Sequence, residues 1–195
     1  MTISRLRNSA ATWYKSCKSY KLAVQLPIDV KTFARNRTLE RFEVAETVPL
    51  PVELVWKAHE NVQLLERIAP PFPIVRLKES NIVCGLDTHF TVRVELLGLG
   101  VDCQVKITRW DPPVCFIDEQ VSGPFKFWEH THKFMPITSE STRIVDSVKF
   151  ELNPLLDGTL IRLGLETMFK LRMQNLKQVL SEPTFHISAN QADFS

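Results

Sequence analysis

The sequence lacks most of the patterns that assign a chain quickly to a class of protein. No run of 18 or more apolar residues occurs, although apolar residues make up 44% of the composition, so no segment is predicted to cross a membrane. No apolar segment is followed by a small-residue cleavage site, which argues against secretion. GxSxG, GxGxxG and P-loop patterns are also missing, which argues against a familiar serine hydrolase, Rossmann enzyme or NTPase.

Cysteine is scarce and its spacing is uninformative. The four cysteines (Cys17, Cys84, Cys103 and Cys115) form no CxxC pair and no regular framework. We therefore expect reduced thiols, mostly packed in strands, in an intracellular protein of cytoplasmic location.

The net charge of +2 hides two oppositely charged parts. Residues 1–37 hold eight Lys/Arg and one acid, Asp29, a balance of +7, whereas the remainder holds 16 Lys/Arg and 21 acids, a balance of −5. A mildly acidic body is not suited to follow a phosphate backbone, so we expect no nucleic-acid partner.

The basic segment 1–37 is predicted to be an N-terminal arm, and three interpretations of it stay open. An Arg- and Ser-containing stretch poor in acids resembles an organelle transit peptide. Leu6, Trp13, Leu22 and Val24 between lysines would also suit an amphipathic helix that makes peripheral membrane contact. The third interpretation is a solvated arm that is dispensable for folding of the body.

Residues 38–182 are predicted to form one domain that begins with a strand and two short helices. Alternation over 39–50 ends at prolines and indicates a strand. Residues 51–70 have helical spacing with Pro51 in the first turn, and we expect a break near Asn61. The prolines of 70–73 end the second helix.

Six further period-two runs follow, each of strand length and separated by short turns. They cover residues 74–80, 85–98, 101–110, 114–121, 126–135 and 142–152. A long helix over 153–182 comes next, with Asn153 as a cap, and residues 183–195 are expected to be a flexible tail. The apolar stripe of the long helix consists of Leu165, Met168, Phe169, Leu176, Val179 and Leu180. The order predicts an α+β fold in which a curved, seven-stranded antiparallel sheet wraps around this helix and leaves a gap.

Two histidines share one face of the strand "KFWEHTHKF". Glu129, Thr131 and Lys133 form the polar face, so Trp128, His130, His132 and Phe134 are predicted to point inward. In the next strand, "TRIVDSVKFEL", Asp146 shares the inward face with Ile144, Val148, Phe150 and Leu152. The turns predict that His132 lies opposite Asp146. A three-residue turn would place His130 opposite Asp118 and Gln120 opposite Trp128, whereas a four-residue turn would instead bring Glu119 to the inner face. A buried carboxylate needs a partner, and histidine supplies one.

The stretch "FIDEQVSGPFKFWEHTHKF", followed by "RIVDSVKFEL" and a long helix, resembles the START / Bet v 1-like (SRPBCC) superfamily. More specifically, it resembles an uncharacterised bacterial ligand-binding branch of that superfamily. The matching positions are Phe116, Asp118, Gln120, Gly123, Pro124, Phe125, Trp128, His130, His132, Phe134, Asp146 and Val148. Phe150 replaces the usual tyrosine, which removes a hydroxyl. The resemblance covers about residues 38–181 and implies a helix-grip fold.

The resemblance implies an intracellular module that binds a hydrophobic small molecule or lipid between the sheet and the C-terminal helix. We predict that the ligand is lined by Phe116, Asp118, Gln120, Trp128, His130, His132, Phe134, Asp146, Val148, Phe150, Leu165, Met168 and Phe169. One alternative is a polyketide-type cyclase or dehydratase that uses His130 or His132 as base, with Asp146 orienting it. Another is a regulatory or scaffold protein with a filled cavity.

No cofactor and no metal are predicted. Histidines at i and i+2 on a strand can bind zinc, but the sequence reveals no third ligand. His59 is expected at the surface, and His89 on the polar face of its strand.

Overall fold

The computed structural model describes residues 39–152 and 158–182. The expectations about the arm 1–37, the Asn153 cap, the tail 183–195 and Cys17 lie outside these residues.

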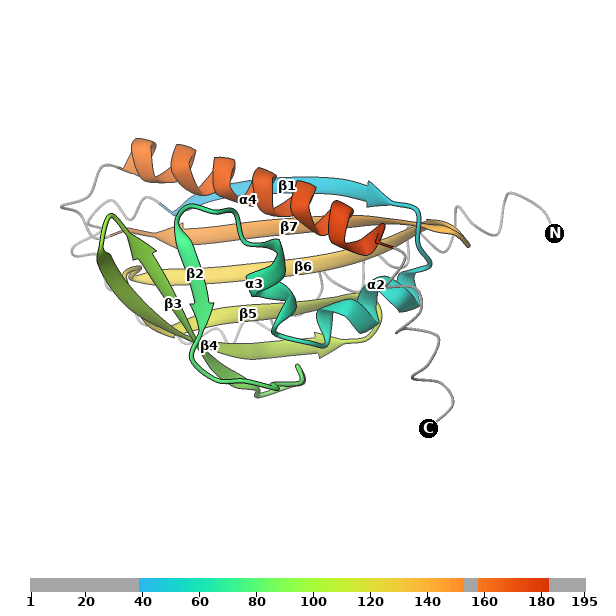
Figure 1. The fold of residues 1–195 in the computed structure, drawn as a ribbon, viewed down its shortest axis with the longest axis horizontal. Coiled ribbons are helices and arrows are strands. Elements are labelled where there is room, and N and C mark those ends of the chain that lie inside the picture. The colour runs from blue at the N-terminus through green and yellow to red at the C-terminus, as the bar shows by residue number, and fades with distance from the viewer. Residues whose placement is uncertain (1–38, 153–157, 183–195) are drawn as a thin grey trace, which may run out of the picture.

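Seven strands form one antiparallel sheet (Figure 1). They are β1 (Glu40–Val48), β2 (Ile74–Leu77), β3 (His89–Leu96), β4 (Leu99–Asp111), β5 (Cys115–Ser122), β6 (Phe127–Thr138) and β7 (Ser141–Glu151). The spatial order is β1-β7-β6-β5-β4-β3-β2, so β2 to β7 follow one another as a meander and β1 pairs with the last strand. This confirms the predicted architecture, because short turns between period-two runs leave no room for crossover helices.

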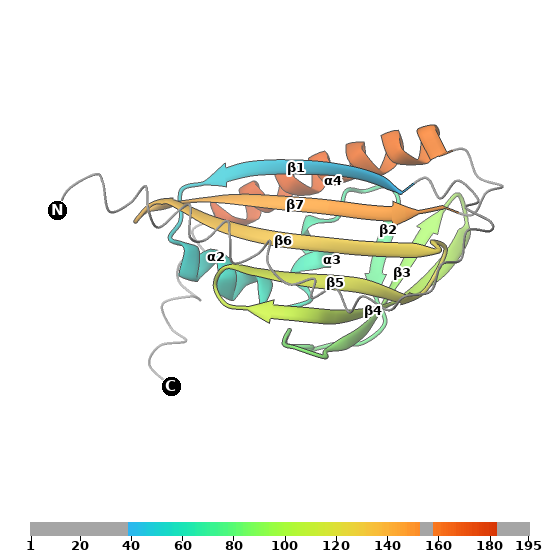
Figure 2. The ribbon, with the colours of Figure 1, turned by 180° about the vertical axis from the view of Figure 1, so that it is seen from behind.

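Within the described residues, three helices cover one face of the sheet, as the two opposite views show (Figures 1 and 2). They are α2 (Val52–His59), α3 (Leu64–Ile68) and α4 (Gly158–Leu180). Pro51 directly precedes α2, and the helical region is interrupted at residues 60–63, which confirms the predicted break. None of the helices in 39–152 and 158–182 is long and apolar enough to cross a membrane.

The core lies between α4 and the sheet. Phe169, Met173, Leu176 and Leu180 of α4 are buried, and the ring of Phe169 lies 5.2 Å from that of Phe42 on β1, nearly edge-to-face. Leu165 and Met168 are partly buried against the same cluster. The predicted stripe on α4 therefore packs against the sheet, and burial of its large side chains is the main force holding the helix there.

Two expectations about exposure are wrong. His59 is only 7% exposed, because the last turn of α2 faces the sheet and the His59 ring lies 4.7 Å from the ring of Phe134. Thr131 lies on the predicted polar face of β6 yet is buried, since β6 is a central strand with paired neighbours on both sides. His89 is exposed, as predicted.

Three described cysteines, Cys84, Cys103 and Cys115, form no disulfide. Cys103 and Cys115 lie in strands β4 and β5, whereas Cys84 lies in the loop before β3. Burial raises the pKa of the Cys84 thiol to about 12, so at neutral pH it is a protonated and weakly nucleophilic group.

Candidate functional site

The pairing of three adjacent strands brings two aspartates and two histidines together. Asp118 on β5 pairs with His130 on β6, and His132 on β6 pairs with Asp146 on β7, which confirms both predicted registers. Alternation along β6 then points both imidazoles to the face covered by α4. We call Asp118, His130, His132 and Asp146 the Asp/His cluster.

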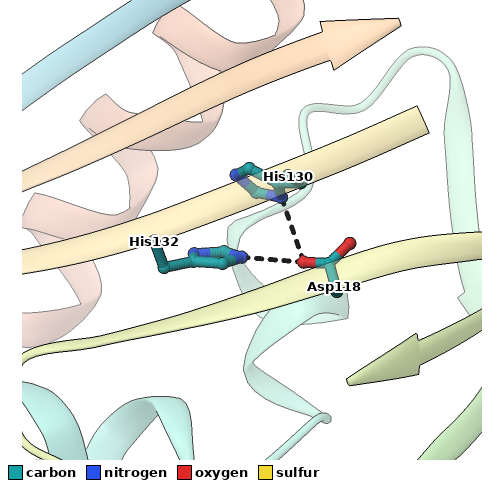
Figure 3. Close-up of side chains that lie close together, drawn as sticks. All are labelled: Asp118, His130 and His132. Carbon is teal, nitrogen blue, oxygen red and sulfur yellow. Dashed lines mark hydrogen bonds and ion pairs between the residues drawn. The ribbon is translucent and has the colours of Figure 1, made fainter. Parts of the chain in front are cut away.

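Each imidazole of the cluster lies between the two carboxylates. Asp118 Oδ2 is 3.0 Å from His132 Nε2 and 3.3 Å from His130 Nδ1, and Figure 3 shows both rings directed at this oxygen. On the other side, Asp146 Oδ1 is 3.1 Å from His132 Nδ1 and 3.6 Å from His130 Nε2. The four side chains therefore form a closed ring of alternating acid and imidazole.

Burial and charge act in opposite directions on these groups. Burial alone would raise the pKa of Asp118, but the charge of His130 and hydrogen bonds from both histidines hold that pKa well below its usual range. Burial would likewise raise the pKa of Asp146, which the charges of His132 and His130 hold far below its ordinary value. Burial would lower the pKa of His130, but the two carboxylates raise it. Ionised aspartates beside a protonated His130 are thus the favoured state.

The contacts to Asp146 are close but poorly aligned. His130 Nε2, His132 Nδ1 and Asp146 Oδ1 are all buried and lack a well-directed hydrogen bond, although the last two atoms are only 3.1 Å apart. We take this contact as electrostatic. The aligned bond in the cluster is the one that His132 Nε2–H donates to Asp118.

Aromatic rings hold both imidazoles in place. Phe116 stacks on His132 with 3.9 Å between ring centroids and an interplanar angle of 17°. Phe169 of α4 meets His130 edge-on at 5.0 Å. These ring contacts restrict rotation of both imidazoles and keep them aimed at the carboxylates.

A pocket of about 540 Å³ opens beside the cluster, between the sheet and the helices α3 and α4. Asp118, His130 and His132 form part of its wall, whereas Asp146 does not. The cluster therefore presents two imidazoles and one carboxylate to the pocket and keeps the second carboxylate behind them. Most of the remaining wall is apolar and comes from α3, β3, β4 and α4.

The predicted ligand-binding residues divide into two groups. The pocket wall contains Phe116, Asp118, Gln120, Trp128, His130, His132, Leu165, Met168 and Phe169. Phe134, Asp146, Val148 and Phe150 are at most 3% exposed and lie in the layer behind the wall. Phe134, Val148 and Phe150 belong to the hydrophobic core, and Phe134 packs against Trp56 of α2.

Gln120 lines the pocket, but its amide group is already engaged. Gln120 Nε2 donates to the backbone carbonyl of Phe125 at 2.7 Å, and the Phe125 N–H points to Gln120 Oε1 at 3.4 Å. A Cβ on Gly123 would collide with this side chain. The run from Gln120 to Phe125 thus forms a fixed turn between β5 and β6, which sets the register that pairs Asp118 with His130.

Sequence reasoning missed the wall residues of α3, β3 and β4, and it also missed two basic side chains, His59 and Arg172. His59 Nδ1–H donates to the carbonyl oxygen of Val55 at 2.7 Å, and burial lowers the pKa of His59 to about 4 against the opposing effect of that bond. Arg172 of α4 also lines the pocket. Neither position belongs to a motif. The signal for Arg172 was its place on the helix, three residues after Phe169 on the same face.

Asp118, His130 and His132 could also hold a metal ion. Each offers one ligand atom, and these atoms lie within 4.8 Å of one another. Two imidazoles and a carboxylate suit zinc or another transition metal. The third ligand that strand spacing did not reveal is thus Asp118, brought in from β5. The same carboxylates raise the pKa of His130, so a proton on that ring would compete with an ion for the cluster.

The fold and site together define a START-like, helix-grip protein with a pocket between sheet and C-terminal helix. The family model "Polyketide cyclase / dehydrase and lipid transport" matches residues 48–177. Because this match spans more than half of the 195 residues, the chain belongs to that family.

Solved structures agree on the fold. A START superfamily protein from Mycobacterium smegmatis matches with a TM-score of 0.59 at 12% identity over 71% of this chain and 94% of that chain. The Zhui aromatase/cyclase from Streptomyces sp. R1128 matches with a TM-score of 0.58 at 15% identity, covering 75% and 98% of the two chains. A protein from Thermus thermophilus matches with a TM-score of 0.57 at 18% identity, covering 73% and 100%. No curated protein matches the sequence.

Proposed function

We propose that this protein binds a hydrophobic small molecule or lipid in the pocket between the sheet and α4. The observation that carries the proposal is the pocket of about 540 Å³, which falls within the range of about 300–1,000 Å³ typical of ligand sites. Its wall is mainly apolar, with a few polar groups gathered at the Asp/His cluster. Apolar surface supplies affinity in such sites, and a few polar groups set the orientation of the ligand.

The position of the cluster fits this role. His130 and His132 are each 3% exposed and are held by aromatic contacts and carboxylates, so they form a fixed polar surface at one end of the pocket. Both nitrogens of each ring face Asp118 or Asp146, so this surface would orient the polar end of a ligand by electrostatics rather than through an unengaged N–H donor. A pocket of this volume also argues against the alternative in which the protein's own side chains fill the interior.

The first experiment is purification from the native source, followed by mass spectrometry of extracted small molecules. We expect an apolar molecule to copurify with the wild-type protein and to be lost in Val94→Trp, since Val94 lines the pocket from β3. His89→Trp is the matched control, because His89 lies on the exposed side of the same strand. An equal yield of the molecule from Val94→Trp would refute binding in this pocket.

A second candidate function, a cyclase or dehydratase acting on a polycarbonyl substrate, is favoured by one feature of the site. Two imidazoles face the pocket while Asp146 lies behind them, an arrangement in which a carboxylate orients an imidazole for proton transfer. His132→Ala separates the two functions. In a binding module it weakens ligand retention in a folded protein, whereas in an enzyme it abolishes turnover while binding persists.

A further inference from the structure

Arg172 is the charged side chain of α4 that the rest of the described chain does not compensate. The helix carries four basic residues in all. The other three each contact a carboxylate: Arg162 contacts Glu40 at 3.8 Å, Lys170 contacts Glu166 at 2.8 Å, and Lys177 contacts Glu46 at 3.0 Å. Within residues 39–152 and 158–182, Arg172 forms no ion pair and no hydrogen bond.

The environment of Arg172 makes this lack of a partner costly. Its Nε atom is buried and has no hydrogen-bond acceptor among the described residues, and its guanidinium carbon lies 5.3 Å from the centre of the Phe169 ring. A guanidinium carries five N–H donors and loses hydration when it is covered. The contact with Phe169 compensates part of the charge, but it supplies no acceptor for Nε.

Arg172 also gives the pocket wall a positive charge that no carboxylate in the wall compensates. Among the described residues it is the single Lys or Arg in the pocket wall, and Asp118 is the single carboxylate. Asp118 is already compensated by His130 and His132 at 3.3 and 3.0 Å. The guanidinium therefore faces a pocket in which no described acid is available to it.

The polar and apolar parts of the pocket wall are separated in space. Phe169 contacts both His130 and Arg172, and the His59 ring lies 6.2 Å from that of His132, so the polar groups gather around one region. The hairpin of β3 and β4 supplies another part of the wall, which contains the aliphatic residues Val92, Val94 and Val101. In Figure 1 the hairpin of β3 and β4 lies at the end of the sheet opposite α2. A molecule that fills the pocket therefore meets a cation at one end and aliphatic side chains at the other.

We propose that Arg172 is an anion-binding residue and that the ligand is an apolar molecule carrying a carboxylate, with its acidic end at Arg172 and its apolar body along β3 and β4. The planar guanidinium fits a carboxylate in a two-pronged contact. The ligand would supply the acceptor that buried Nε lacks. This inference rests on the proposed binding function and narrows the ligand to one chemical class.

Calorimetric titration with two matched probes tests the inference. Dodecanoate and dodecanol have the same chain length and differ at the head group; dodecanoate is added below its critical micelle concentration and dodecanol below its solubility limit. We expect the wild-type protein to bind dodecanoate about 10- to 100-fold more tightly than dodecanol, the usual size of a charge-assisted contact away from bulk water. Arg172→Gln should remove this preference and leave the affinity for dodecanol unchanged.

Lys170→Gln is the matched control, because it removes the same charge from the same helix at a solvent-exposed position paired with Glu166. It should retain the preference for dodecanoate. If Lys170→Gln lowers dodecanoate affinity as much as Arg172→Gln does, the effect is a general one of net charge and the inference fails. Arg172→Lys keeps the charge but not the two-pronged shape, so it should retain part of the preference.

The outcomes separate this inference from the proposed function. If the wild-type protein binds dodecanol as tightly as dodecanoate, the pocket binds apolar molecules and the assignment of Arg172 is overturned. If it binds neither probe, both the apolar pocket and the anion site are overturned. The wild-type comparison decides between these outcomes even if Arg172→Gln does not fold.

Discussion

Acidification from pH 7 to pH 5 should destabilise this protein through one residue, His59. The side chain ends α2 and is 7% exposed. Its Nδ1–H donates to the Val55 carbonyl oxygen at 2.7 Å. Burial lowers the pKa of His59 to about 4, so the ring is neutral in the folded protein at pH 5, whereas an unfolded histidine, with a pKa of about 6.5, is mostly protonated.

The size of the effect follows from that difference in pKa. Between pH 4 and 6.5 the unfolded chain binds more protons than the folded chain, so the free energy of unfolding rises with pH across this window. Above pH 6.5 the His59 ring is neutral in both states, and it no longer changes the free energy of unfolding. The contribution of His59 should fall by about 2 kcal/mol between pH 7 and pH 5, and by about 3 kcal/mol once the pH is below the folded pKa. Asp118 and Asp146 do not add to this loss, because their pKa values are lowered and their contributions disappear only in stronger acid.

His130 should act in the opposite direction at higher pH. Its pKa is raised above the ordinary value, so its stabilising contribution is complete below about pH 6.5 and is lost as the pH rises through the folded pKa. The contribution of His130 is therefore constant between pH 6.5 and 5, and the loss of stability in that range is attributed to His59.

Urea denaturation at pH 7, 6 and 5 measures the effect. The free energy of unfolding of wild-type protein should fall by about 2 kcal/mol over this range, and that of His59→Leu should be nearly constant. His89→Leu, at an exposed histidine of β3, should behave like the wild type. If His59→Leu loses as much stability on acidification as the wild type, the argument from burial is refuted.

Three further predictions follow from single features of the chain. Asp146→Ala removes one partner from a buried ionic group and should lower the free energy of unfolding by about 3 kcal/mol in urea; a loss below about 1 kcal/mol would contradict a stabilising role. Gly123→Ala should lower the free energy of unfolding by about 1–2 kcal/mol, because the added Cβ displaces Gln120 and breaks its hydrogen bonds to Phe125. An unchanged melting temperature would show that this turn does not constrain the pairing of β5 with β6. A shortened chain starting at Asn36 should still melt cooperatively, since β1 begins at Glu40; a non-cooperative melt would make the arm part of the core.

Local patterns were sufficient to predict most of the architecture. Alternation located the strands, and the Pro51 and Asn61 positions located the two short helices, because these signals arise from neighbouring residues and short-range sterics. The register of the histidine strand was also predictable, since a two-fold alternation and short turns leave few ways to pair β6 with its neighbours. His59 was missed because the exposure of a helix end depends on the element that packs against it.

The sequence by itself determined the order of the elements, the inward face of β6 and the pairing of His132 with Asp146, since alternation and turn length act over a few residues. Only the tertiary structure decided that Asp118 contacts both histidines, that Phe134 and Phe150 lie behind the pocket wall, and that Arg172 faces the pocket without a partner among the described residues. These facts depend on how far the sheet curves and where α4 crosses it. Curvature and crossing result from the packing of side chains distant in sequence, so no local pattern contains them.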